Sequence, residues 1–573
     1  MAKIWMPNPL TTLVCGVIHF LGAFVLYYYF LAPESSSGHI GFLNAYVAKA
    51  RGMFYELFSF RAVILAGVFG SGTVALYGLI GVLIDQRQFQ KLAVWTGMGL
   101  FVYSFLMLAG YLANPNYLDA GESHVTMLSL LLKDGKPIYS ELDNPDLANT
   151  WYGPVLFIVN AAFLLIVPDP ILATKLRGII GLMAGFWLFF HFASKRYGKT
   201  LVWIGSAYII LTLFLAFFFA VGNRADSLII AFSLAAAAGA TLGGSRRRMW
   251  MAAICMAAAV NCKVTAAAYM LPIGAYIAVT YGWKPALQTT FLAMGLFFVP
   301  FLVFSLFPLN HYMAYIMMAT DNAFERALLL ENIGFSLFLM FPFLWVFVKC
   351  RGKGGDVGKD SMVATGITLF ALAVVSLTAS KEGSGFYHLL AFAPGLALLW
   401  IHFTNKLGKE LNISIPGGLA GVSWVLGCLL LTLGGNMEFL YGFKLRGGQN
   451  PGNEIRQIIQ DYPGKRIAMG YGQGNDYSDT RLFYRPLLYK TTRNNPMNAV
   501  TMIEFYCSKQ PIPQSAIERF GNRTYDLFLI PKEEEPFSNN LFEGLGIAET
   551  FGLNYVHLED RNFFGVWEAN FVR

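Results

Sequence analysis

Long uninterrupted runs of apolar residues, separated by short polar connections, make up most of the chain. Runs such as 10–31 and 291–307 are near or above the roughly 18 residues that mark a membrane-spanning helix. The pattern therefore predicts a polytopic α-helical membrane protein. The expected helices cover residues 10–31, 60–84, 92–113, 171–193, 201–221, 225–244, 249–262, 264–282, 287–307, 333–348, 361–379, 386–403 and 416–434.

Basic residues between these runs indicate which connections face the cytosol, because short loops rich in Lys and Arg stay inside. With a cytosolic N-terminus they predict about 13 crossings and place the C-terminus outside. The apolar run 155–167 would break this alternation. It is short and bracketed by prolines, so we expect it to dip into the outer leaflet without spanning. The cytosolic clusters are Lys195-Arg196-Lys199, Arg246-Arg247-Arg248, Lys349-Arg351-Lys353-Lys359 and Lys406-Lys409.

The character of the chain changes at about residue 444. From there Pro, Asn, Asp and Glu become frequent, and the apolar runs shorten to strand length at 466–469, 526–530 and 565–568. Residues 444–573 are long enough for a small α/β domain. The predicted topology places this domain outside the cytosol. The glycine-rich run 470–474 lacks the dinucleotide-binding spacing, which favours a plain loop.

Composition supports the membrane assignment and removes two other classes. Hydrophobic residues make up 56% of the chain and charged residues 13%, against roughly 25% in soluble domains. The net charge of +8 is spread over small clusters rather than one domain, which argues against nucleic-acid binding. The six cysteines show no metal-type spacing and indicate neither a zinc site nor a disulfide framework.

Charged residues gather at the external ends of several predicted helices. Such residues are costly near a membrane unless they have a partner or a function. These residues could also have purely structural roles: helix capping by the acids, a tight turn at 222–226, and snorkelling of Lys263 to the headgroups. The residues at this face are Asp119, Glu122, His124, Lys175, Arg177, Arg224, Asp226, Lys263, Lys381, Tyr387 and His388.

A carboxylate and several cations at one membrane face suit group transfer from a lipid phosphate. The carboxylate can take the proton of an attacking hydroxyl. Arg and Lys can stabilise the charge that grows on the departing phosphate. The dipping segment would help to shape a slot for the lipid chain.

The order of these charged residues along the chain resembles that of the GT-C superfamily of integral-membrane glycosyltransferases. The resemblance is to the members that use polyprenyl-phosphate sugars, a group that includes the protein O-mannosyltransferases and the lipid A aminoarabinose transferase. The resemblance covers roughly residues 90–435 and lies more in order and topology than in any single motif. The segments that carry it are Asp119-Ala120-Gly121-Glu122, the Leu-rich stretch 130–139, Trp151-Tyr152-Gly153-Pro154, Arg224-Ala225-Asp226, Lys263-Val264-Thr265, and Lys381-Glu382-Gly383-Ser384-Gly385 with Tyr387-His388.

The resemblance implies three regions. Residues 1–90 would be additional N-terminal transmembrane helices, 91–443 a GT-C-like catalytic core with a large first external loop at 114–170, and 444–573 the extracytoplasmic α/β domain. The expected location is a bacterial inner membrane, with the N-terminus cytosolic and the C-terminal domain periplasmic.

The implied activity is inverting transfer of a single sugar from a polyprenyl-phosphate carrier to an extracytoplasmic acceptor, which could be a glycolipid, a polysaccharide or a protein. The base would be Glu122 or Asp119; counting back from Gly135, Glu122 fits the acidic position of the family better. A divalent metal is compatible with this chemistry but not required by it, and no metal ligand is assigned. Donor phosphate and substrate binding would fall to Arg224, Asp226, Lys263, Lys381, Tyr387, His388, His124 and Tyr152.

Two other functional classes compete with this interpretation. A secondary transporter or lipid flippase also places charges in helices, but transporters often show internal repeats and sites near mid-membrane. The chain shows no convincing repeat, and its polar groups cluster at one face. A non-catalytic scaffold with a partner-binding outer domain is the third possibility.

Overall fold

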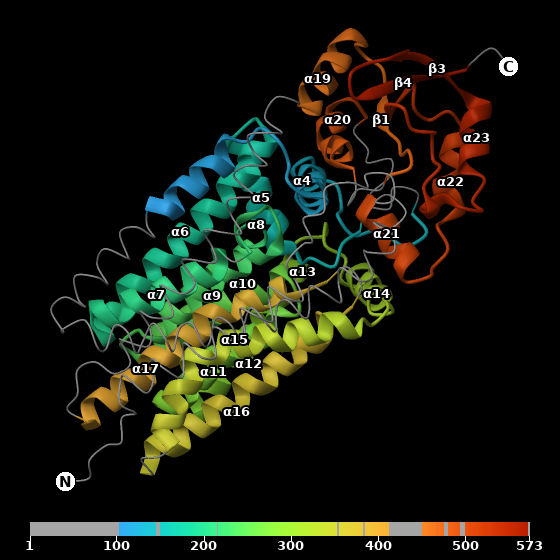
Figure 1. Cartoon of the computed structure of the whole chain (residues 1–573). Coiled ribbons are helices and arrows are strands. Elements are labelled where there is room, and N and C mark those ends of the chain that lie inside the picture. Colours follow the sequence, from blue (N-terminus) through green and yellow to red (C-terminus); the bar gives the residue numbers. More distant parts are fainter. Residues whose placement is uncertain are drawn as a thin grey trace, which may run out of the picture.

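A computed structural model of the chain describes residues 102–144, 149–214, 216–351, 355–381, 384–411, 450–474, 479–492 and 499–570. Most of residues 102–411 are helical (Figure 1). After a first helix at Val102–Ala113, the elements are α4 (Ala120–Lys133), α5 (Pro154–Ile166), α6 (Pro170–Tyr197), α7 (Lys199–Phe214), α8 (Phe217–Val221), α9 (Ala225–Ala240), α10 (Ser245–Cys262), α11 (Ala266–Tyr281), α12 (Trp283–Phe297), α13 (Val299–Val303), α14 (Leu309–Ala319), α15 (Arg326–Arg351), α16 (Gly355–Thr378), η1 (Phe386–Phe392) and α17 (Ala393–Leu411).

Five stretches of the described chain are long and apolar enough to cross a membrane: Pro170–Tyr197, Trp283–Val303, Arg326–Leu344, Gly358–Thr378 and Phe386–Gly408. The 28 residues of α6 extend over about 42 Å, which exceeds the roughly 30 Å of a hydrocarbon core. Large apolar side chains on α12 and α13, such as Phe291, Met294 and Leu302, are exposed, as expected of lipid-facing residues. The protein is therefore an integral membrane protein.

The expected helices and the observed ones differ in a few places. The run 201–221 forms two helices, α7 and α8, and the run 287–307 ends as a helix at Val303. A separate helix, α14, follows it and was not expected from the sequence. With 13 residues, α5 covers only about 20 Å and is too short to span. Residues 10–31, 60–84 and 416–434 lie outside the described residues, so the total of about 13 crossings remains a prediction.

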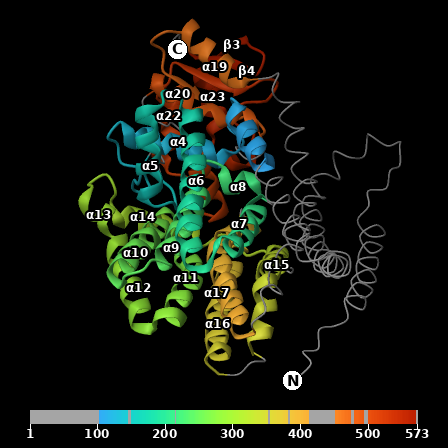
Figure 2. The ribbon, with the colours of Figure 1, turned by 90° about the vertical axis from the view of Figure 1, so that its left-hand side faces the viewer.

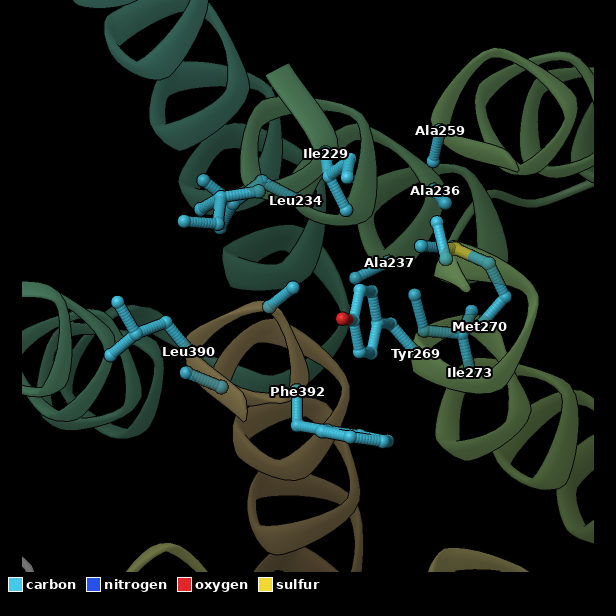
Figure 3. Close-up of a cluster of buried hydrophobic side chains, with 14 of the residues drawn as sticks. Ile229, Leu234, Ala236, Ala237, Ala259, Tyr269, Met270, Ile273, Leu390 and Phe392 are labelled. Carbon is cyan, nitrogen blue, oxygen red and sulfur yellow. The ribbon is translucent and has the colours of Figure 1, made fainter. Parts of the chain in front are cut away.

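Helix α9 forms the centre of the helical bundle. Each of its residues except Phe232 is buried. Its many alanines let neighbouring helices approach closely, which is how small side chains stabilise packing in a membrane. Figure 3 shows Ala236 and Ala237 of α9 beside Tyr269 and Ile273 of α11, with Phe392 of η1 close by.

The C-terminal residues form a four-stranded mixed sheet with helices around it. The strand order is β1-β2-β4-β3, with β1 parallel to β2 and the other neighbours antiparallel. The strand β3 was not expected from the sequence. The elements are α19 (Pro451–Asp461), β1 (Ile467–Met469), η2 (Thr480–Tyr484), α20 (Arg485–Thr492), α21 (Ala499–Cys507), α22 (Gln514–Gly521), β2 (Leu527–Pro531), η3 (Asn540–Phe542), α23 (Ile547–Asn554), β3 (Tyr555–Asp560) and β4 (Phe564–Ala569).

This C-terminal region lies over the end of the bundle that carries α4, as both views show (Figures 1 and 2). The Tyr484 hydroxyl donates to Asn116 Oδ1 over 2.6 Å, and the Thr501 hydroxyl donates to the Asn149 carbonyl over 3.0 Å. Tyr117 and Ala120 belong to the same buried cluster as the sheet residues. The C-terminal region is thus packed on residues 114–144 and 149–150, which lie close to the candidate site.

Candidate functional site

Four short segments of the chain come together beneath the C-terminal region. They are the start of α4, the turn from α8 to α9, the turn from α10 to α11, and η1. Each of these lies next to an apolar helix, so the polar side chains are held at helix ends by the surrounding core. The structure thereby brings together residues that are far apart in the sequence.

Arg224 is the centre of this cluster. Its Nη1 lies 2.6 Å from Asp119 Oδ2, and its Nε lies 3.7 Å from Asp226 Oδ2. The guanidinium carbon lies 5.0 Å from the ring centroid of Phe219 and 5.2 Å from that of Tyr387. Both partners of the Arg224–Asp119 pair have side chains 12% exposed, so the pair is shielded yet reachable. A charge-assisted bond of this kind fixes the carboxylate in one orientation.

Lys263 supplies a second cation on the opposite side of Asp226. Its Nζ lies 3.3 Å from His388 Nδ1, which in turn lies 3.7 Å from Asp226 Oδ1. Lys263 stands in the connection between α10 and α11, outside both helices. Burial lowers the pKa of the Lys263 amine to about 8, and the nearby Asp226 carboxylate opposes this shift.

Tyr152 and Gly153 tie the entrance of α5 to Lys263. Tyr152 forms an isolated antiparallel bridge with Lys263, and the Gly153 amide donates to the Cys262 carbonyl over 3.0 Å. The Lys263 amine lies 5.9 Å from the Tyr152 ring centroid. A Cβ at Gly153 would stand 1.9 Å from the Asn261 carbonyl oxygen, so only glycine permits this approach.

We expect Gly153→Ala to destabilise the protein by about 1–3 kcal/mol, because the new methyl group must push two backbones apart. The shift would also displace Lys263. Gly274→Ala is the matched control, since a Cβ at Gly274 in α11 meets nothing within 4 Å. The apparent Tm of the two variants in detergent measures the difference. Equal Tm values for both variants and the wild type would contradict this close packing.

Glu122 has a different environment from Asp119. It is fully buried, and its carboxylate accepts hydrogen bonds from the Tyr111 hydroxyl, from the Leu118 amide over 2.8 Å and from the Asn223 amide over 3.0 Å. The Asn223 side chain also donates to the Glu122 carbonyl over 3.1 Å. Both carboxylate oxygens therefore bond to the protein itself, and they fix the turn that carries Arg224.

Arg177 and Lys175 of α6 extend this buried network. Arg177 donates to Asn160 Oδ1 over 2.9 Å, to Ser227 Oγ over 2.7 Å, and to Asn223 Oδ1. Lys175 donates to the carbonyls of Tyr111 and Asn114, over 3.2 and 2.7 Å. These cations are used to hold backbone and amide groups in place. The sequence places them at this face but does not predict that Tyr111, Asn223 and Asn160 are their partners.

The remaining predicted residues fall into two groups. Tyr387 is stacked on Phe219 at 4.0 Å and flanks Arg224, so it belongs to the cluster. His124 is buried in α4, two residues after Glu122. Lys381 instead donates a hydrogen bond to the Thr320 carbonyl and forms an isolated antiparallel β-bridge with Phe324. Within the described residues, it makes no contact with the cluster around Arg224. Its part in substrate positioning remains a prediction.

Within the described residues, no group of three His, Cys, Asp or Glu side chains is placed to hold a metal ion. The cationic side chains of the site are Arg224, at 2.6 Å from Asp119, and Lys263, at 3.3 Å from His388. They can bind an anionic group such as a phosphate.

Comparison with known proteins identifies the fold. No family model and no curated protein sequence matches the chain. Among solved structures, the crystal structure of ArnT from Cupriavidus metallidurans bound to undecaprenyl phosphate matches with a TM-score of 0.55 and 14% identity, over 83% of this chain and 98% of that one. The apo structure of the same protein matches with a TM-score of 0.50 and 12% identity, over 82% and 97%. The chain therefore has the fold seen in the ArnT structures.

Proposed function

We propose that this protein is a glycosyltransferase that moves a single sugar from a polyprenyl-phosphate carrier to an acceptor hydroxyl outside the cytosol. The observation that carries the proposal is the Arg224–Asp119 pair at 2.6 Å, with Lys263 in the same buried cluster. This arrangement places a carboxylate and two cations together in a fold shared with ArnT, whose crystal structure contains undecaprenyl phosphate.

The reaction uses the three charged groups in distinct ways. The Asp119 carboxylate accepts the proton of the acceptor hydroxyl, whose oxygen then bonds to the anomeric carbon with inversion. The bond between that carbon and the phosphate oxygen breaks, and polyprenyl phosphate leaves with the bonding electrons. Arg224 and Lys263 stabilise the charge on this leaving group.

We assign the base to Asp119 rather than to Glu122. The carboxylate of Glu122 already accepts three hydrogen bonds from Tyr111, Leu118 and Asn223, and it is fully buried. Asp119 bonds to Arg224 through Oδ2, and its side chain is 12% exposed. A general base needs a free lone pair that an acceptor can reach, and Asp119 meets this condition.

The surrounding residues orient these groups. Asp226 lies between Arg224 and His388, at 3.7 Å from each, and so separates the two positive sides of the site. The Tyr387 ring flanks Arg224, while the bridge at Tyr152 positions Lys263. We further propose that residues 444–573 form an extracytoplasmic α/β domain over the site and that residues 1–90 are additional membrane helices.

The test is release of free polyprenyl phosphate. Purified protein is given a panel of polyprenyl-phosphate sugars and an envelope extract as the acceptor source, and the lipid phosphate is measured. We expect release with one donor class, dependent on the acceptor. If folded protein with acceptor present releases no lipid phosphate from any donor, the transferase proposal is wrong and a transporter or flippase becomes the better candidate.

The pKa of Lys263 gives a pH dependence for lipid-phosphate binding. Burial lowers this pKa to about 8, and a bound phosphate must raise it by stabilising the ammonium form. Affinity for polyprenyl phosphate is therefore expected to be flat between pH 7 and 8 and to fall by up to about tenfold per pH unit above that. The second ionisation of a phosphate monoester lies near pH 6 and is complete in this range.

Lys263→Arg separates this effect from other titrations, because Arg stays charged throughout the range. Competition of polyprenyl phosphate against the release reaction gives the affinity at each pH. The wild type should lose affinity above pH 8 while the Arg variant does not. Identical profiles would show that Lys263 does not contact the phosphate.

A further inference from the structure

A second cationic cluster lies at the opposite end of the bundle from the candidate site. It consists of Arg196 at the end of α6, Arg248 at the start of α10 and Tyr281 at the end of α11, and we call it the Arg–Tyr cluster. Helices α6 and α11 begin at the candidate site and end here, while α10 runs the other way. The proposed transfer reaction has no use for these residues.

The two arginines lie against one aromatic ring. The Arg248 guanidinium carbon lies 3.5 Å from the Tyr281 ring centroid, and that of Arg196 lies 5.0 Å from it. Arg196 also donates to the Tyr281 hydroxyl, which itself donates to the Ala240 carbonyl over 3.2 Å. The ring thus fixes both guanidinium groups in one place.

The Arg–Tyr cluster carries two positive charges. Among the residues that the structure describes, no carboxylate pairs with Arg196 or Arg248. Arg248 is 8% exposed, and its guanidinium lies over the Tyr281 ring. Arg248 is buried and Arg196 is exposed, so two like charges lie close together at the edge of the bundle, where a bound anion would offset their repulsion.

The level of the cluster in the membrane indicates the source of that anion. Trp203, Trp250 and Trp283 stand near the starts of α7, α10 and α12, at this same end, and are 49%, 40% and 56% exposed. Exposed tryptophans at helix ends are typical of the headgroup level of a bilayer. Arg246, Arg247 and Lys195 add positive charge around the cluster. Basic pockets between transmembrane helices at this level suit lipid phosphates.

We propose that the Arg–Tyr cluster binds the phosphate of an anionic phospholipid in the leaflet opposite the candidate site. Arg248 and Arg196 would donate to the phosphate oxygens, and the lipid chains would lie along the apolar helices beneath. This site is separate from the proposed transferase site and does not depend on that function.

The experiment is a thermal-shift titration of the full-length protein in a neutral detergent. Phosphatidylglycerol, phosphatidylcholine and inorganic phosphate are added separately, and the apparent Kd is taken from the rise in Tm. We expect phosphatidylglycerol to stabilise the wild type. Arg248→Gln and Arg196→Gln should each weaken this binding about fivefold, the value expected for one phosphate-contacting cation.

Arg247→Gln is the matched control, because it removes the same charge from an exposed position next to Arg248. Its affinity for phosphatidylglycerol should change less than twofold. If Arg248→Gln does not fold, Arg248→Lys replaces it, and loss of the planar guanidinium should still weaken binding.

Three outcomes would overturn the proposal. An equal loss in Arg247→Gln would mean a diffuse surface charge rather than a site. Equal stabilisation by phosphatidylcholine would remove the need for an anionic headgroup. Stabilisation by inorganic phosphate at the same concentration, dependent on Arg248, would make this a site for free phosphate and not for a lipid.

Discussion

Asp119→Asn is expected to reduce sugar transfer by about 10²–10⁴-fold, the range that a positioned general base contributes. Asparagine keeps the shape of the side chain and can still accept a hydrogen bond from Arg224, which now lies 2.6 Å from Asp119 Oδ2. It cannot accept the proton of the attacking hydroxyl. The loss should therefore appear in kcat, measured as acceptor-dependent release of polyprenyl phosphate, while donor binding changes little.

Asp321→Asn provides the matched control for this variant. Asp321 is an exposed carboxylate that follows α14, outside the Arg224 cluster, and its removal should leave the release rate within about twofold, as for most surface substitutions. A second readout protects against misfolding: Asp119→Asn should keep the apparent Tm of the wild type within a few degrees. If Asp119→Asn transfers sugar at the wild-type rate, the base is not Asp119.

The helical framework could be predicted well from the sequence wherever polar residues or prolines interrupt the apolar runs. Pro154 and Pro170 stand in the first turns of α5 and α6, and Arg224 stands directly before α9. The break between α7 and α8 could not be predicted, because residues 199–221 are apolar on both sides of it. For α14 the difficulty was similar, since its apolar residues follow those of α13 after only a short connection.

The sequence alone could predict which residues form the candidate site, but not the role of each residue. Charged residues at helix ends are visible in a sequence, so Asp119, Arg224 and Lys263 could be named. Their contacts decide what each does, and contacts depend on the packing of distant segments. Tyr111 is the clearest example. It lies in an apolar helix, so the sequence predicts an ordinary core residue, but in the structure its hydroxyl donates a hydrogen bond to Glu122.

The dependence of roles on packing also explains why sequence spacing alone favours Glu122 over Asp119 as the base. Counting along the chain from Gly135 takes no account of burial, and the two acids are only three residues apart. Residues three apart on a helix share a face, but Asp119 is the N-cap and has an extended backbone, so its carboxylate does not follow that of Glu122. In this structure Asp119 is the residue before α4, while Glu122 in the first turn is buried against Tyr111 and Asn223.

Glu122→Ala is expected to lower the stability of the folded protein by about 3–5 kcal/mol, the cost of breaking a buried charged network. The substitution leaves the Tyr111 hydroxyl and the Leu118 and Asn223 amides without their acceptor. It also removes a carboxylate whose negative charge stabilises the buried cations Lys175 and Arg177. The apparent Tm in detergent measures the loss, and Glu141→Ala, at a carboxylate 69% exposed, is the control that should leave Tm unchanged.

The Glu122 network can be tested further with a double-mutant cycle. Tyr111→Phe removes one of the three donors, so Glu122→Ala should cost less in that background, by roughly the 1–3 kcal/mol of an unsatisfied buried group. Glu122→Gln should lie between the wild type and Glu122→Ala, because its amide can accept from only some of the donors. A Glu122→Gln protein that keeps its Tm but loses all transfer would reverse the assignment and make Glu122 the base. Retention of both Tm and activity would show that the three hydrogen bonds contribute little to the fold.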